Sequence, residues 1–417
     1  MRVLYCTDTY PPQVNGVSVV TALSVAGLSE RGWDCAVVSP RYPATMRNTF
    51  GAEGYGGTME LERTTLASVP MPGYAETRLC APDYLAVARA VRRFAPDLVH
   101  CETEFMAGRL GQIAAARSGV PIATSYHTDF AKYTAAYGVP RLERTVSNYI
   151  SRFHRRALRT YTPSAPARDY LHSIGVVNVE VWGRGVEIEA FTPRRRSVAV
   201  RAMLGADRKF VFLYAGRLAA EKGVDVILEA FAIARAALPP DSIHLVIAGG
   251  GPLEDDIRAS ATQDMSFLGY LDRGRSLPEL YASCDAFLFS STTETLGLVV
   301  LEAMASGMPV IATPAGGVAD HLRAEENGLT YPPRDVPAMA AQMIRLAQDH
   351  ALAARLGAGA RLTAESLSWE LEYDRLDLSY RELLEDQPAG ASWYCSSFPS
   401  AISYVHTRSE RPANVTR

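Results

Sequence analysis

Apolar and polar positions follow two distinct patterns along this chain. Short runs that are apolar on both faces recur along it, and stretches with a helical spacing of apolar residues lie between them. The runs predicted as strands cover residues 2–6, 35–39, 97–102, 121–127, 160–164, 210–216, 244–250, 265–270, 285–291, 309–314 and 328–333. The predicted helices include residues 17–30, 84–94, 224–235 and 298–306. Such strands, separated by helices, form parallel sheets covered on both sides, so the sequence predicts an α/β fold.

The strands fall into two series, which predict two doubly wound, Rossmann-like domains that face each other across a cleft. The break is expected near 182–200, where turn residues, a proline and a basic cluster precede a fresh strand. We expect a first domain at 1–188 and a second at 189–370. A helix at 371–386 can pack back on the first domain, and the tail at 387–417 is expected to be poorly ordered.

Composition narrows the class of protein. The net charge of −3 argues against binding to nucleic acid. Six scattered cysteines without a C-x-x-C pair indicate reduced thiols, and no signal peptide or membrane-length apolar run is evident, so a cytoplasmic protein is expected. No D-x-D, H-x-x-E-H or Cys/His ligand spacing occurs, and neither a metal nor a cofactor is predicted.

Two cations mark the loop after the strand at 210–216. Arg217 and Lys222 flank this loop, and a helix begins near Val224. Cations beside a helix N-terminus make an anion site that suits a diphosphate, although a solvated loop with two surface cations has the same spacing. Lysine occurs at only three positions of this arginine-rich chain, so its retention at 222 favours the phosphate site.

A glycine triplet follows the strand at 244–250. These glycines allow close approach of a ligand, or of a strand to a helix, and a plain strand-to-helix turn is the simpler interpretation. Gly250 is kept as a candidate for substrate binding. The segment lacks the full dinucleotide fingerprint, which argues against a NAD site.

Two glutamates, eight residues apart, occupy the segment "TETLGLVVLEAMASG". Glu294 lies in a loop with Thr295, and Glu302 lies inside an apolar helix without a basic residue three or four positions away. A buried carboxylate needs hydrogen-bond donors, and a ribose diol offers two, whereas the alternative is a side chain that reaches water beside the helix. The backbone amides of three residues at the helix start form a second anion-binding element. These are Leu296, Gly297 and Leu298.

The first half of the chain has its own candidates after strands. Asn15 and Gly16 lie in the loop after the strand at 2–6, where a glycine permits tight approach to a ligand. His127 follows the strand at 121–127, a position that favours a site role over a structural one. A basic helix predicted over 141–161 could meet anionic lipid heads, or could pack on the sheet with a solvated face.

Taken together, "GRLAAEKGVD", "GGGP" and "TETLGLVVLEAMASGMPVIAT" resemble retaining nucleotide-sugar glycosyltransferases of the GT-B fold, of the family-4 type. The resemblance covers residues 1–385, and "PPQVNGVS" and "SYHTDF" are more similar to the subgroup that uses GDP-mannose or to sulfoquinovosyl-type enzymes. It implies an N-terminal acceptor domain and a C-terminal domain that binds the nucleotide-sugar donor. The chain departs from many members at Asn15, where they have a glycine, and at Gly250, where they have an acidic residue.

The resemblance also implies a role for each candidate residue. Glu302 would bind the ribose hydroxyls, and Glu294 the hydroxyls of the donor sugar. Arg217 and Lys222 would neutralise the diphosphate. In the other domain Gly16 would approach the same phosphates, and His127 would reach the sugar near the reacting carbon.

The implied reaction moves a hexose, mannose from GDP-mannose in the first instance, onto a lipid or glycolipid acceptor without a metal. The enzyme would then associate peripherally with the inner face of the membrane. A transferase that uses a UDP-sugar, glucosyl or sulfoquinovosyl, is one alternative. A nucleotide-sugar epimerase of the same architecture is another, and it would turn over without an acceptor.

Overall fold

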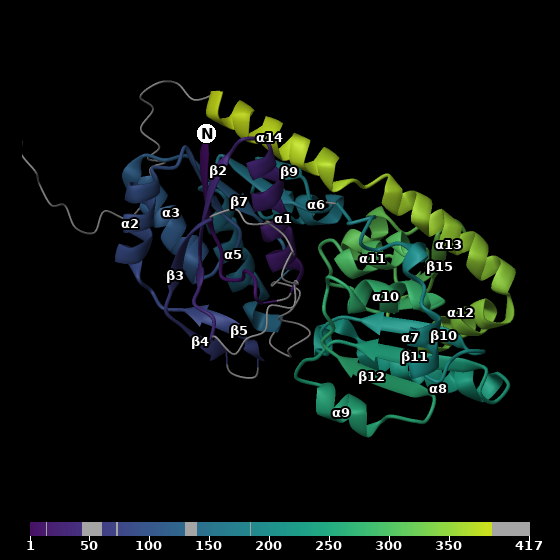
Figure 1. The fold of residues 1–417 in the computed structure, drawn as a ribbon. Coiled ribbons are helices and arrows are strands. Elements are labelled where there is room, and N and C mark those ends of the chain that lie inside the picture. Colours follow the sequence, from purple (N-terminus) through teal and green to yellow (C-terminus); the bar gives the residue numbers. More distant parts are fainter. Residues whose placement is uncertain (14, 44–60, 72–73, 130–139, 184, 386–417) are drawn as a thin grey trace, which may run out of the picture.

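The computed structural model describes residues 1–13, 15–43, 61–71, 74–129, 140–183 and 185–385, so the predicted tail at 387–417 lies outside the described residues. Two α/β lobes lie side by side, the N-terminal lobe in purple and blue and the C-terminal lobe in green (Figure 1). The predicted architecture of two Rossmann-like domains is confirmed.

The N-terminal lobe is built on a seven-stranded parallel sheet of order β3-β2-β1-β6-β7-β8-β9. Its strands are β1 (Arg2–Cys6), β2 (Asp34–Pro40), β3 (Glu62–Leu66), β6 (Leu98–Cys101), β7 (Ile122–Ser125), β8 (Arg159–Thr162) and β9 (Val179–Val181). Its helices are α1 (Gly16–Glu30), α2 (Tyr84–Phe94), α3 (Met106–Ser118), α5 (Glu143–His154) and α6 (Ala165–Ser173). The strands β4 (Ser68–Met71) and β5 (Tyr74–Cys80) form a separate antiparallel pair. The strand order reverses between β1 and β6, which is where such sheets place their ligands.

The C-terminal lobe repeats the arrangement with a six-stranded parallel sheet of order β12-β11-β10-β13-β14-β15. Its strands are β10 (Phe210–Ala215), β11 (Ile243–Ala248), β12 (Met265–Gly269), β13 (Ala286–Phe289), β14 (Val310–Ala312) and β15 (Gly328–Thr330). Its helices are α7 (Val198–Met203), α8 (Val224–Ala237), α9 (Glu254–Ala259), α10 (Ser276–Ser283), α11 (Leu298–Ala305), α12 (Val336–Gln348) and α13 (His350–Glu365). Every residue of β10 and β11 is buried, because helices cover both faces of the sheet. The switch point lies between β10 and β13.

The last helix, α14 (Trp369–Glu385), leaves the C-terminal lobe and packs on α1 of the N-terminal lobe (Figure 1). Arg31 at the end of α1 forms an ion pair with Asp374 at 2.7 Å, and the Trp33 indole N–H donates to Asp377 at 2.6 Å. The linker between the lobes is buried under the same helix, since the Trp182 indole donates to the Glu372 carbonyl oxygen at 2.6 Å. One apolar core therefore runs from β1 through α14 into the C-terminal lobe.

The single helix predicted over 141–161 is wrong in its last third. The helix α5 ends at His154, and Tyr161 lies in β8, where it pairs with Ser125 of β7. The sheet's need for a partner to β7 overrides the helical spacing of the apolar residues there. Within the described ranges, no helix combines the length and apolar character needed to cross a lipid bilayer.

Candidate active site

The carboxyl ends of the two sheets meet through two loops. His127 follows β7 in the N-terminal lobe, and Thr295 lies between β13 and α11 in the C-terminal lobe. The Thr295 hydroxyl donates to the backbone carbonyl oxygen of His127. A second contact lies nearby in the fold, where Asp320 accepts from the Ala165 amide at the start of α6 at 3.0 Å. The predicted site residues of both lobes thus converge on one edge.

Two glycines, Gly316 and Gly317, pack against the backbone of the loop that carries Glu294. The Gly317 amide donates to the Glu294 carbonyl oxygen at 2.8 Å. A Cβ at Gly316 would lie 2.1 Å from the Glu294 carbonyl oxygen, and one at Gly317 would lie 2.1 Å from that of Thr295. No larger residue fits at either position, so these glycines let the loop with Glu294 and Thr295 lie directly against them. The sequence reading assigned them no role, although a paired glycine directly after a strand was the available signal.

Lys222 and Glu294 form an ion pair across the mouth of the C-terminal sheet. Lys222 is the last residue of the short 3₁₀ helix η3 (Ala220–Lys222). The Ser290 hydroxyl donates to the Lys222 carbonyl oxygen at 2.7 Å and so fixes this end of the helix. The residues had been assigned to different parts of the donor, and the structure places them in direct contact.

Arg217 belongs to the same cluster. The Tyr214 hydroxyl at the end of β10 donates to the Arg217 carbonyl oxygen at 2.8 Å. Burial raises the pKa of this tyrosine, Lys222 and Arg217 lower it, and Glu294 raises it. All three predicted residues therefore lie within electrostatic reach of one buried hydroxyl, and two of the three are cations.

Glu302 is buried, with 1% of its surface exposed, which rules out the alternative in which it reaches water. Its basic partner is Arg273, which follows β12 and was not foreseen because it lies on another element. Arg273 also pairs with Glu187 of the linker at 2.8 Å. Burial raises the pKa of Glu302, and Arg273 opposes the increase. In the described part of the chain neither carboxylate oxygen of Glu302 accepts a hydrogen bond of ordinary geometry, so both retain capacity for donors.

Asn15 and Gly16 lie at the start of α1. The Asn15 side chain accepts from the Ser18 amide at 2.9 Å and donates to the Thr9 hydroxyl at 2.7 Å, which makes it the N-cap of the helix. Both ends of its amide are therefore used within the loop. Gly16 differs, because a Cβ there would meet no atom within 4 Å. Packing does not require a glycine at this position, and the space above it is open.

The glycine triplet packs the strand ends of the C-terminal lobe together. A Cβ at Gly249, whose φ is +123°, would lie 2.0 Å from the Gly216 carbonyl oxygen. One at Gly250 would lie 2.5 Å from the Tyr270 ring, and the Gly250 carbonyl oxygen accepts from the Leu218 amide at 2.9 Å. Contacts between loops thus account for the triplet without a ligand.

His127 has a carboxylate partner that the sequence analysis did not predict. Its Nε2 lies 2.5 Å from Oε2 of Glu102, which directly follows β6 and is 1% exposed. Burial raises the pKa of Glu102, but His100 and His127 outweigh it and hold the pKa below its ordinary value. The signal was a glutamate at the carboxyl end of the predicted strand at 97–102.

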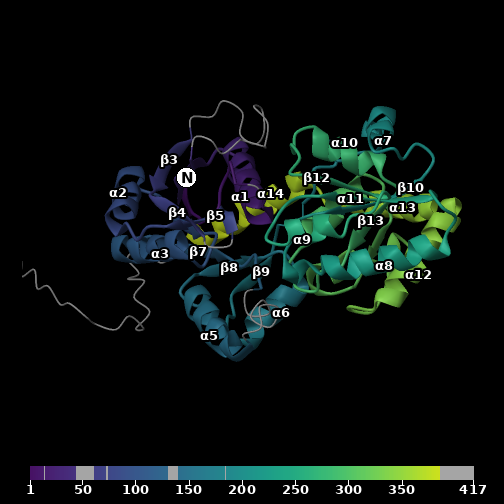
Figure 2. The same cartoon turned by 90° about the horizontal axis from the view of Figure 1, so that it is seen from below.

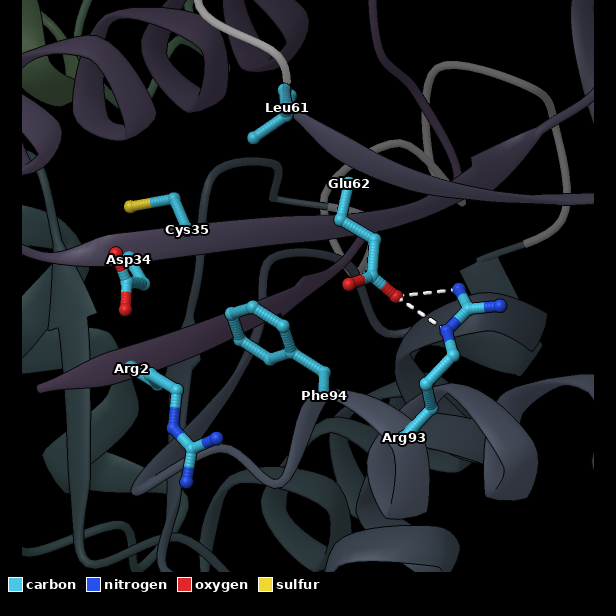
Figure 3. A pocket seen from close by; sticks show the side chains of 7 residues that line it. All are labelled: Arg2, Asp34, Cys35, Leu61, Glu62, Arg93 and Phe94. Carbon is cyan, nitrogen blue, oxygen red and sulfur yellow. Dashed lines mark hydrogen bonds and ion pairs between the residues drawn. The ribbon is translucent and has the colours of Figure 1, made fainter.

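A separate pocket of about 430 Å³ lies at the opposite edge of the N-terminal sheet (Figure 3). Arg2, Asp34 and Glu62 line it from the first residues of three strands, and Arg93 pairs with Glu62 at 2.5 Å. It contains none of the predicted site residues. Among the described residues, no group of three or more His, Cys, Asp or Glu is arranged to hold a metal ion.

Comparisons with known proteins bear on both lobes. Residues 209–349 match the family described as glycosyl transferases group 1, and residues 14–190 match glycosyltransferase family 4. A GDP-mannose-dependent alpha-mannosyltransferase of Mycobacterium tuberculosis is 32% identical over 380 residues, which cover 90% of this chain and 95% of that one. A sulfoquinovosyl transferase of Arabidopsis thaliana is 31% identical over 337 residues, covering 78% of this chain and 63% of that protein.

Solved structures share the fold at lower identity. The Anabaena protein HepE, solved in complex with UDP, superposes with a TM-score of 0.72 at 19% identity, over 92% of this chain and 100% of that chain. A sucrose-phosphate synthase from Thermosynechococcus elongatus superposes with a TM-score of 0.74 at 20% identity, over 93% of this chain and 99% of its own. The two-lobed architecture is therefore common to these proteins and this chain.

Proposed function

This chain belongs to glycosyltransferase family 4, and we propose on that premise that it transfers a hexose, with retention of configuration, from a nucleoside diphosphate sugar to a lipid or glycolipid acceptor. The observation that carries the proposal is the cluster of Arg217, Lys222 and Glu294 around the Tyr214 hydroxyl. Glu221 adds a second carboxylate to this surrounding. Cations beside carboxylates at a strand end match a sugar diphosphate, which presents anionic oxygens beside hydroxyl groups.

The proposed chemistry stabilises the leaving group. The bond between the anomeric carbon and a phosphate oxygen breaks, and negative charge grows on the diphosphate. Lys222, Arg217 and the first amides of α11 lie where they can stabilise that charge, which is the task that a metal performs in other transferases. The acceptor oxygen bonds to the anomeric carbon from the same face, and its proton passes to the departing diphosphate. The ion pair of Lys222 with Glu294 would be exchanged for phosphate on one side and sugar hydroxyl on the other.

The donor we propose is GDP-mannose. Support comes from the M. tuberculosis relative and from a second GDP-mannose-dependent alpha-mannosyltransferase, of Mycolicibacterium smegmatis, 31% identical over 92% of this chain and 98% of that one. A UDP-sugar remains the alternative donor, and a sulfoquinovosyl transferase is among the relatives of the chain. Both readings use the same residues, since the diphosphate and ribose are common to GDP and UDP donors.

A thermal-shift panel with GDP, UDP, ADP and their sugars tests the donor, because a ligand that binds only the folded state raises the unfolding temperature. We expect stabilisation by GDP and GDP-mannose. Stabilisation by UDP species alone would overturn the GDP-mannose assignment. Transfer of labelled mannose to a lipid extract, measured with and without EDTA, tests the reaction. Turnover abolished by EDTA and restored by Mg²⁺ or Mn²⁺ would refute the metal-free step.

A further inference from the structure

We infer that Glu102 is a positioning residue that fixes the ring of His127, so that Nδ1 is the nitrogen presented to the donor sugar. The inference rests on the proposed function, because it assumes that a sugar lies against His127. Glu102 itself would contact neither the sugar donor nor the acceptor.

The first support is the geometry of the pair. The backbones are set by adjacent parallel strands, with Cys101 of β6 in register with Thr124 of β7. Glu102 is fixed further because its amide donates to the Cys6 carbonyl oxygen at 3.0 Å. From there its carboxylate reaches His127 Nε2 at 2.5 Å. An imidazole whose Nε2 donates to a carboxylate carries its proton on that atom, and in the neutral ring Nδ1 is then an acceptor.

The second support is the layer beneath the pair. His100 Nε2 lies 2.7 Å from the Ser125 hydroxyl, and its Nδ1 contacts the hydroxyl of Tyr380 from α14. His100 lies 3.9 Å from the other oxygen of Glu102 but is fully buried, and burial lowers its pKa to about 4. At neutral pH His100 is therefore uncharged, and the contact with His127 Nε2 is the closest one that the Glu102 carboxylate makes to either histidine.

A hydrogen-bonded carboxylate behind an imidazole fixes both the tautomer and the direction of the ring. The other ring nitrogen, Nδ1, can then accept from a sugar hydroxyl in one orientation only. Because the His127 carbonyl oxygen also accepts from Thr295, the same residue is held on two sides. Loss of Glu102 would leave the residue in place but release the ring, so turnover should suffer more than binding of the nucleotide.

The chain offers a matched control on the next residues of the same strand end. Glu104 is also buried, and its Oε1 lies 3.3 Å from Nε2 of His154 at the end of α5. His154 turns its Nδ1 to the Thr124 hydroxyl at 2.9 Å. This second pair has the same chemistry and is buried at both residues, but His154 makes no described contact with the C-terminal lobe. Glu104→Met therefore measures what the loss of a buried His–Glu pair costs by itself.

The test is a double-mutant cycle with Glu102→Met, His127→Ala and the double variant, assayed for kcat, donor KM and the Kd of GDP. Glu102→Met should lower kcat about ten- to a hundred-fold, as is typical when a group that orients a site ligand is removed. The Kd of GDP should change less than about two-fold, and in the His127→Ala background the same change should add nothing. Glu102→Gln, whose carbonyl still accepts from Nε2–H, should recover part of the loss.

Equal losses in both backgrounds, or an equal loss in Glu104→Met, would overturn the inference. The ring itself gives a readout that does not depend on transfer. Histidine ¹⁵N spectra, with His127→Ala to assign the signal, should show the Nε2–H tautomer in the wild type and a mixture in Glu102→Met. Absence of that tautomer in the wild type would refute the positioning role even if transfer occurs. Presence of the tautomer without any hexose transfer would instead refute the proposed function.

Discussion

Glu294 and Glu302 lie eight residues apart in the chain, yet their surroundings differ in kind. Glu294 is partly exposed and pairs with Lys222, whereas Glu302 is buried and pairs with Arg273. The partly exposed pair can be exchanged for a ligand, because both side chains reach solvent at 18% and 19% exposure. The buried pair cannot be opened cheaply, so Glu302 would use its remaining acceptor capacity rather than give up its arginine.

This difference predicts distinct effects of two substitutions. Glu302→Gln should weaken binding of free nucleoside diphosphate about ten- to a hundred-fold, because a hydrogen bond to a charged group contributes about 1.5–3 kcal/mol. Glu294→Gln should keep or tighten that binding, since it releases Lys222 for the phosphates, and should lower kcat by misplacing the sugar. Isothermal titration with the diphosphate alone separates them, and the reverse pattern would mean that the two roles are exchanged.

Two glycines of the site predict opposite consequences of the same change. Gly16→Ala meets no atom within 4 Å, so the free energy of unfolding should change by less than about 0.5 kcal/mol while the affinity for the donor falls. Gly317→Ala would place a methyl group 2.1 Å from a backbone oxygen, and should destabilise the fold by about 1–3 kcal/mol. Urea unfolding and donor titration of both variants check this. Unchanged donor affinity in Gly16→Ala would remove that glycine from the site.

His100 predicts a pH dependence of stability. Burial lowers its pKa to about 4 in the folded protein, whereas an unfolded histidine titrates near 6.5. Between these values the unfolded chain binds the extra proton, so this contribution is complete above about pH 6.5 and is lost as the pH falls toward 4, about 3 kcal/mol in all. The difference in unfolding free energy between wild type and His100→Gln, measured from pH 7 to 4, isolates it. A difference that does not vary with pH would contradict the buried neutral state.

At the scale of elements, the strands were predictable and the side-chain partners were not. A run such as residues 210–215 is apolar on both faces and has only one plausible place, the interior of a covered sheet. The pairing of Glu302 on α11 with Arg273 in the loop after β12, and of Glu102 with His127 after the adjacent strands β6 and β7, arises when segments far apart in the sequence fold together. Nothing in the local spacing carries that information, whereas Lys222 was recognisable because the chain uses lysine so sparingly.

The seam between α1 and α14 gives a prediction at this scale. A Cβ at Gly27 would lie 2.3 Å from the ring of Tyr373, so Gly27→Ala should force α14 outward and destabilise the fold by about 1–3 kcal/mol. In a Tyr373→Ala background the ring is gone, and the same substitution should cost about nothing, or gain slightly from helix propensity. Chemical unfolding of the four proteins completes the cycle. An equal cost in both backgrounds would mean that the contact with Tyr373 at the seam is not the reason for a glycine at position 27.

At the scale of the whole molecule, a chain with a net charge of −3 still carries a local basic surface. Arg109, Arg152 and Arg156 interact electrostatically, and like charge together with burial lowers the pKa of Arg156. Tyr149 of α5 lies beside them, is 43% exposed and donates its hydroxyl to the Glu104 carbonyl oxygen. Exposed apolar side chains lie at the starts of α3 and α5, the helices that carry Arg109 and Arg152: Phe105, Met106 and Leu142. Figure 2 shows α5 at the outer face of the N-terminal lobe, away from the C-terminal lobe.

Cations and exposed apolar side chains on the same two helices suit an anionic bilayer surface, where the apolar groups enter the headgroup region and the arginines meet phosphates. We therefore predict that the protein co-sediments with vesicles rich in anionic lipid at low ionic strength, and that added salt releases it. Arg152→Glu should weaken this binding about ten-fold or more, because each basic residue near such a surface contributes about 1 kcal/mol and the reversal adds repulsion. Arg355→Glu, on α13 of the C-terminal lobe, changes the net charge equally and serves as the control. Equal binding by all three proteins, or none by the wild type at low salt, would leave the basic surface without a membrane role and would favour a soluble acceptor.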